Sequence, residues 1–185
     1  MGLRKASAYS KKRVNPYTRK SRAKEKAYIK TVPQNKIVKF VMGNQKAYNE
    51  GKHPFVVRLI SEERVLVRDN ALEAGRMLIN KKMDTSAPGM YYFIVRVYPH
   101  HILRENKTAA GAGADRVSTG MTQSFGVTIG RAAIVNVGQD IFYISCENEK
   151  AVRAAREALK DAKAKVPCRC RVVFKKVSDI KIREN

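Results

Sequence analysis

The chain has 185 residues, of which 38 are Lys or Arg and 16 are Asp or Glu, so its formal net charge is +22. No apolar run approaches the roughly eighteen residues of a membrane span, and the charged N-terminus lacks the apolar segment of a secretory signal. A mitochondrial transit peptide is harder to exclude, although residues 1–30 show no amphipathic stripe and are interrupted by Pro16. The length fits a single domain over residues 1–185.

The first thirty residues form a strongly basic segment. They contain eleven Lys or Arg, three Tyr and one acid, Glu25, which gives a local charge of +10. Such a segment has too little apolar area to fold alone, and its cations and aromatic rings suit the phosphates and unpaired bases of nucleic acid. We therefore predict an extended RNA-binding arm over residues 1–35 rather than a merely solubilising tail. Its predicted contact residues are Arg4, Lys5, Lys11, Lys12, Arg13, Tyr17, Arg19, Lys20, Arg22, Lys24 and Lys26.

Short β-branched and apolar runs predict the strands of the first half of the chain. They are expected at residues 36–42, 55–60, 64–68 and 90–98, with a loop at 44–54. The strand 90–98 is the clearest, because its side chains alternate. Its core face is predicted to contain Tyr91, Phe93, Val95 and Val97.

A helix is predicted from Asn70 to Lys82, with Asp69 as its N-cap. Lys81 and Lys82 would then lie in the last turn, where the helix dipole favours cations. Gly75 lowers helix propensity, so we expect it to mark a close contact between this helix and a sheet.

In the second half, strands are expected at residues 125–129, 131–137, 140–146 and 168–174. Gly138-Gln139 suits a type II′ turn, which predicts that 131–137 and 140–146 are antiparallel neighbours. A second helix is predicted from Asn148 to Lys165. Its core stripe comprises Val152, Ala155, Leu159, Ala162 and Val166, and a separate basic row, either solvated or functional, comprises Arg153, Arg156, Lys160 and Lys163.

This order of elements predicts the fold class. Strands and helices follow one another without strict alternation, and at least one tight hairpin is expected. The pattern favours an α+β protein, a two-layer sandwich of a mainly antiparallel sheet with about two helices, plus the basic N-terminal arm.

Three cysteines, Cys146, Cys168 and Cys170, are an odd number, which disfavours a disulfide framework and suits a reducing compartment. Cys168 and Cys170 alternate along a predicted strand, so their thiols are expected on one side of a sheet. A structural zinc site takes four ligands, and no second cysteine pair follows. We therefore predict no metal site.

Residues 100–123 form a long Gly/Ala-rich segment, and loops of this length are usually functional or disordered. Gly111 and Gly113 give it a slim backbone, and Arg104, Lys107 and Arg116 are candidate phosphate ligands. The segment lacks the third glycine of a dinucleotide fingerprint and the Gly-Lys-Ser/Thr of a P-loop. No nucleophilic triad or carboxylate cluster is evident, so we predict neither an enzyme nor a cofactor.

Motifs spread along the chain carry a family resemblance. They are Asn15–Arg19, Lys36-Ile37, Leu72–Arg76, Val95–Val97, Pro99-His100, Ala112–Arg116, Thr119–Met121, Phe125-Gly126 and Val137–Gln139. In this order they resemble L-ten-e, the archaeal and eukaryotic form of the universal L-sixteen family of large-subunit ribosomal proteins. The chain ends at Asn185 without the long extension of eukaryotic members, so the archaeal type is expected.

The resemblance implies a structural constituent of the large ribosomal subunit in the cytoplasm, monomeric within the ribosome and in contact with neighbouring ribosomal proteins. The arm would bind large-subunit ribosomal RNA by phosphate contacts, which fix position without reading sequence. The loop around residues 104–121 would approach transfer RNA acceptor ends and help position them near the peptidyl transferase centre. The alternative is a free-standing, chromatin-type nucleic-acid-binding protein.

Overall fold

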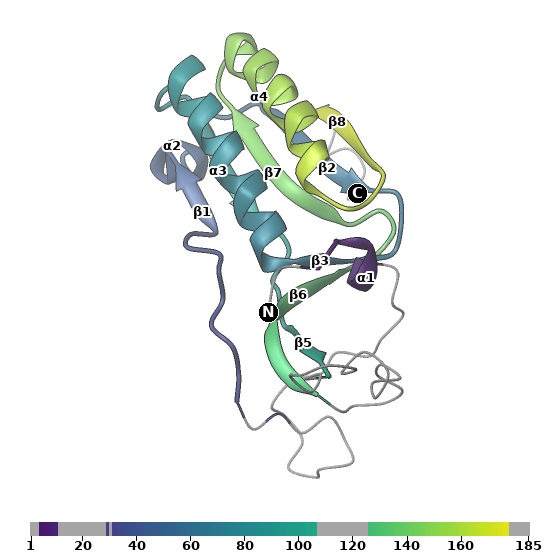
Figure 1. The fold of residues 1–185 in the computed structure, drawn as a ribbon. Helices are drawn as coiled ribbons and strands as arrows, with labels where there is room; N and C mark the ends of the chain where they lie inside the picture. The colour runs from purple at the N-terminus through teal and green to yellow at the C-terminus, as the bar shows by residue number, and fades with distance from the viewer. Residues whose placement is uncertain (1–3, 11–28, 30, 107–125, 178–185) are drawn as a thin grey trace, which may run out of the picture.

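The computed structural model of the protein describes residues 4–10, 29, 31–106 and 126–177, and it contains two antiparallel sheets (Figure 1). The larger sheet has, in spatial order, β1 (Val41–Gly43), β4 (Tyr91–Val95), β7 (Asp140–Cys146), β2 (Phe55–Ser61) and β8 (Cys170–Lys176). The smaller sheet has the order β3 (Val65–Arg68), β6 (Val127–Val135) and β5 (His101–Glu105). The predicted α+β class is confirmed.

Two long helices, α3 (Asp69–Ser86) and α4 (Glu149–Ala162), lie side by side over one face of the larger sheet (Figure 1). A 3₁₀ turn, η1 (Lys163–Lys165), extends α4, and two short helices, α1 (Ser7–Ser10) and α2 (Gln45–Asn49), lie elsewhere. Burial of apolar side chains between helices and sheet supplies the main favourable free energy of such a layered fold.

The predicted core faces are confirmed. Tyr91, Phe93, Val95 and Val97 are all buried, as are the five residues of the α4 stripe. Gly75 lies directly against the sheet, because a Cβ atom added there would sit 2.8 Å from Cζ of Phe142 in β7. The close contact expected at this glycine is therefore also confirmed.

The predicted ends of α3 were wrong. The helix begins at Asp69, with Arg68 as its N-cap, and continues to Ser86 because Met83 extends the buried stripe. The Asp69 carboxylate accepts from the backbone N–H of Asn70 at 2.8 Å and of Lys36 at 3.2 Å, so it ties the preceding segment to the helix. Lys82 lies before the last turn and forms an ion pair with Asp161 of α4.

The predicted hairpin between 131–137 and 140–146 was also wrong. These segments belong to β6 and β7, which lie in different sheets. The strand predicted at 125–129 is not separate, because its residues 127–129 are the first part of β6. Gly138 does adopt the positive φ of a turn, +79°. However, its N–H donates to the carbonyl of Ser61 at 2.8 Å, and Ser61 donates to the carbonyl of Gln139 at 3.0 Å. The turn is thus anchored on the end of β2 while the chain crosses between sheets.

Other boundaries also differ from the sequence-based expectations, including those of β4, which ends at Val95, and of β8, which begins at Cys170. The predicted loop 44–54 contains α2, which is capped by Asn44 through the backbone N–H of Ala47 at 3.1 Å. The strand expected over 36–42 is limited to β1, and the predicted loop 100–123 begins with β5. No helix within the described ranges has the length and apolar character needed to cross a membrane.

Candidate nucleic-acid interface

The long Gly/Ala-rich segment connects the two strands of a hairpin. β5 pairs with β6 in antiparallel fashion, and the register places Glu105 opposite Val127. The connection therefore leaves and re-enters the smaller sheet at the same end. Arg104, in β5, is half-buried. The other four predicted loop contacts, Lys107, Gly111, Gly113 and Arg116, lie outside the described residues, so their roles stay predictions.

The beginning of the basic arm packs on the smaller sheet. Tyr9 of α1 is buried against Leu66, Leu103 and Ala132. The Arg68 guanidinium lies 5.3 Å from the centroid of the Tyr9 ring and donates to the backbone carbonyl of Arg4 at 3.0 Å. This attachment was not predicted from the sequence. Its one local signal was Tyr9, an isolated aromatic residue in a segment that has almost no aliphatic side chains.

Two predicted RNA contacts of the arm, Arg4 and Lys5, are exposed. Arg4 also forms an ion pair with the buried carboxylate of Glu105, with Nε and Oε1 3.3 Å apart. The remaining contacts predicted for the arm, from Lys11 to Lys26, lie outside the described residues. Arg4 therefore links the arm to the last residue of β5, next to the start of the predicted loop.

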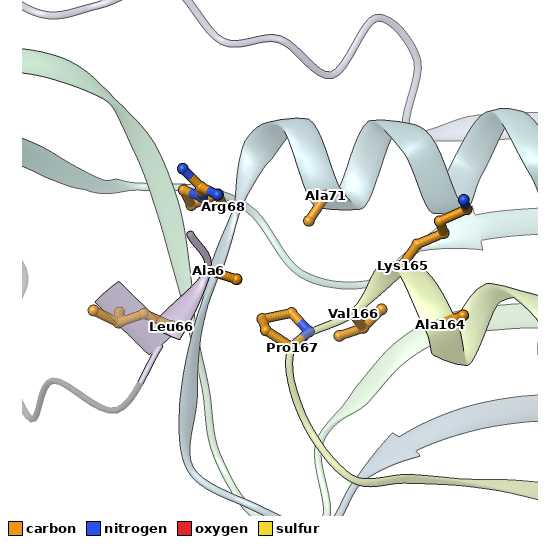
Figure 2. Close-up of a pocket in the computed structure, with 8 residues that line it drawn as sticks. All are labelled: Ala6, Leu66, Arg68, Ala71, Ala164, Lys165, Val166 and Pro167. Carbon is orange, nitrogen blue, oxygen red and sulfur yellow. The ribbon is translucent and has the colours of Figure 1, made fainter. Parts of the chain in front are cut away.

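A small cavity of about 130 Å³ adjoins this attachment (Figure 2). Ala6 contributes from the arm, Ala71 from α3, and Val166 and Pro167 from the segment after η1. Its lining is mostly small and apolar, and Arg68 and Lys165 are its only charged residues among those described. Such a lining offers few polar groups to orient a small ligand. We therefore assign the cavity no binding function.

The described surface carries a surplus of unpaired cations. Acidic side chains pair with Arg4, Lys52, Arg58, Arg76, Lys82 and Arg169. Many exposed cations have no ion pair with any described residue, so their charge is available to a partner. They are Lys5, Lys36, Lys39, Lys46, Arg64, Lys81, Arg96, Lys150, Arg153, Arg156, Lys160, Lys165, Arg171 and Lys176.

The buried histidines are held in their neutral form. Burial, followed by the charges of His100 and Arg104, lowers the pKa of His101 to about 4. Burial likewise lowers the pKa of His53, whose Nδ1 lies 2.8 Å from Oγ of Ser145. Neutral histidines add no charge to the surface near neutral pH.

The thiols of Cys168 and Cys170 lie side by side, with their sulfurs 3.2 Å apart, but Cys168 precedes β8 and is not part of the strand that was predicted to begin at residue 168. Hydrogen bonds, first from Cys170 and then from Ser61, lower the pKa of Cys168, whereas burial raises the pKa of Cys146 to about 12. No group of three or more His, Cys, Asp or Glu side chains within the described part of the chain is arranged to hold a metal ion.

The surplus of unpaired cations on this α+β protein is typical of proteins that bind nucleic acid. The family described as ribosomal protein L16p/L10e matches residues 13–173. The chain is 45% identical over 182 residues to large ribosomal subunit protein uL16 of Methanococcus maripaludis strain C7, a match that covers 97% of this chain and 98% of that relative. The uL16 proteins of Staphylothermus marinus and Thermoplasma acidophilum are 44% and 41% identical, over 95% and 97% of both chains.

The chain therefore belongs to the ribosomal protein L16p/L10e family, and the resemblance predicted from its motifs is confirmed. It is a structural constituent of the ribosome and not an enzyme.

Proposed function

We propose that the protein binds large-subunit ribosomal RNA through its basic arm and helps to position transfer RNA acceptor ends through the segment that joins β5 to β6. The observation that carries the proposal is the antiparallel pairing of Glu105 with Val127. A hairpin holds both ends of its connection together, so a slim, basic segment can extend from a fixed base. The proposed partners also include neighbouring ribosomal proteins, with one copy of the chain in each subunit.

The arm is proposed to supply most of the affinity for ribosomal RNA. Its local charge of +10 would release condensed counterions from phosphates. Deleting residues 1–30 is a poor test, because it also removes Tyr9, which is buried on the smaller sheet. Replacing Lys11, Lys12, Arg13, Arg19 and Lys20 by Gln leaves Tyr9 in place. This variant is expected to fold but to be lost from large subunits at high salt, and retention like that of the wild type would refute the proposal.

The loop is proposed to act on transfer RNA rather than in docking. Deleting residues 107–118 leaves β5 and its Glu105–Arg4 ion pair intact. We expect the shortened protein to enter large subunits, and the resulting ribosomes to bind transfer RNA and translate poorly. Equal loss of subunit assembly would make the loop a docking element instead.

Sucrose-gradient fractionation of cell extract at moderate and high salt tests the proposed place of action. The protein is expected in large subunits and in translating ribosomes, in amounts equal to other large-subunit proteins. A free pool at the top of the gradient, with none in subunits, would instead favour the free-standing nucleic-acid-binding protein.

A further inference from the structure

The basic row of α4 and η1 has no acidic partner among the described residues, and its Arg156 lies toward the edge of the larger sheet. Arg153, Arg156 and Lys160 are exposed, Lys163 is half-buried, and none forms an ion pair with a residue that the structure describes. In Figure 1, α4 lies between α3 and β8. Asp161 marks the α3 side of the helix, because it pairs with Lys82. Arg156 marks the β8 side.

Arg156 is held over an aromatic ring. Its guanidinium carbon lies 4.8 Å from the ring centroid of Phe174 in β8. Phe174 in turn stacks on Phe55 of β2, with centroids 6.0 Å apart and ring planes inclined by 28°. Both rings are half-buried, whereas Arg156 is exposed. A planar cation thus lies over the Phe174 ring, which stacks on Phe55, and the arginine itself is exposed.

This arrangement fits one kind of partner closely. Unpaired bases stack on arginine planes and aromatic rings, and phosphates bind the surrounding cations. The row positions recur at helical spacings of three and four residues, so their side chains lie about 5–6 Å apart along one line. A chain of phosphates beside an unstacked base presents charges in a comparable line.

We propose that the α4–β8 surface, formed by Arg153, Arg156, Lys160, Lys163 and Phe174, binds an unpaired nucleotide of folded RNA. The base stacks on Arg156, which Phe174 supports, and the neighbouring phosphates contact the other three cations. The inference rests on the proposed function and adds a second RNA contact, on a different sheet from the arm and the loop.

An acidic protein segment would also be attracted to the row, but it would not need the ring or the planar guanidinium. A protective role for the edge strand is a second alternative, since cations on edge strands discourage aggregation. Replacing Arg156 by Lys separates these cases. The charge is kept, while the plane that stacks on a base is removed.

The test uses the full-length chain and large-subunit ribosomal RNA purified from salt-stripped subunits, with excess duplex RNA as competitor. Binding constants are measured by filter binding over a range of salt concentrations. The variants are Arg156→Lys, Phe174→Leu, and a triple variant with Arg153, Lys160 and Lys163 replaced by Gln. A matched control replaces Lys39, Lys46 and Lys81 by Gln, since these exposed cations also lack ion pairs among the described residues.

Arg156→Lys and Phe174→Leu are each expected to weaken binding about tenfold, with an unchanged salt slope. The triple variant is expected to reduce the salt slope by about 2, and the control to leave it unchanged. Thermal unfolding shows whether Phe174→Leu stays folded, and Arg156→Lys changes only an exposed side chain.

Wild-type binding by Arg156→Lys would overturn the inference, as would a control that weakens binding as much as the row variant. Loss of binding in the arm variant alone, with every row variant like the wild type, would reject the α4–β8 surface and leave the proposed function standing. A wild-type chain that binds no ribosomal RNA would reject both.

Discussion

Replacing Gly75 by Ala tests how closely α3 packs on the larger sheet. The added Cβ atom would lie 2.8 Å from Cζ and 3.0 Å from Cε2 of Phe142. Phe142 is fully buried and meets Phe93 edge-on with centroids 5.8 Å apart, so its ring cannot move without disturbing a second buried ring. Overpacking costs about 1–3 kcal/mol, and the higher helix propensity of Ala offsets about 1 kcal/mol. We expect the free energy of unfolding to fall by up to about 2 kcal/mol.

Urea unfolding of the full-length chain, followed by circular dichroism, measures this change. Gly130→Ala in β6 is the matched control, because a Cβ atom there meets nothing within 4 Å and stability should not fall. Phe142→Leu supplies the second background, in which the clash is relieved and Gly75→Ala should be neutral or stabilising. A Gly75→Ala cost that is equal in both backgrounds, or a stabilised single variant, would refute the reasoning.

Three further predictions concern buried polar and titratable groups. Asp69→Ala removes the acceptor for the N–H groups of Lys36 and Asn70, so urea unfolding should show that the free energy of unfolding falls by about 1–3 kcal/mol. Asp69→Asn is the control, because it keeps one acceptor oxygen. An equal loss of stability in Asp69→Asn would contradict the assignment. The pKa of His101 is lowered from 6.5 to about 4, so in this window the unfolded chain binds a proton that the folded protein does not. The free energy of unfolding should therefore fall as the pH falls from 6.5 to 4, by at most about 1.4 kcal/mol per pH unit. If His101→Gln shows the same dependence of stability on pH as the wild type, His101 is not the source of that dependence. Burial raises the pKa of Cys146 to about 12, so iodoacetamide at mildly alkaline pH should modify Cys168 faster than Cys146. Peptide mass spectrometry measures the two rates. Equal rates in the folded protein would contradict the buried position of Cys146.

Local sequence patterns were sufficient for the features that depend on neighbouring residues. Short β-branched and apolar runs located β2 and β7, alternation located the core face of β4, and helical spacing located the buried stripe of α4. The charge of the arm and the family motifs likewise depend only on residues that are consecutive in the sequence. These features could be predicted because the side-chain period of a strand or helix is fixed by its backbone geometry.

The tertiary structure alone decided which segments meet. The turn at Gly138 has the residues of a hairpin, yet its N–H bonds to Ser61 and sends β6 and β7 into different sheets. Asp69 looks like an N-cap in sequence, but it is the first residue of α3 and its carboxylate accepts from the N–H of Lys36, 33 residues away. Arg156 acquires its place over Phe174 only when β8 joins the sheet edge beneath α4. Each outcome depends on contacts between distant segments, and local propensity does not encode the free energy of those contacts.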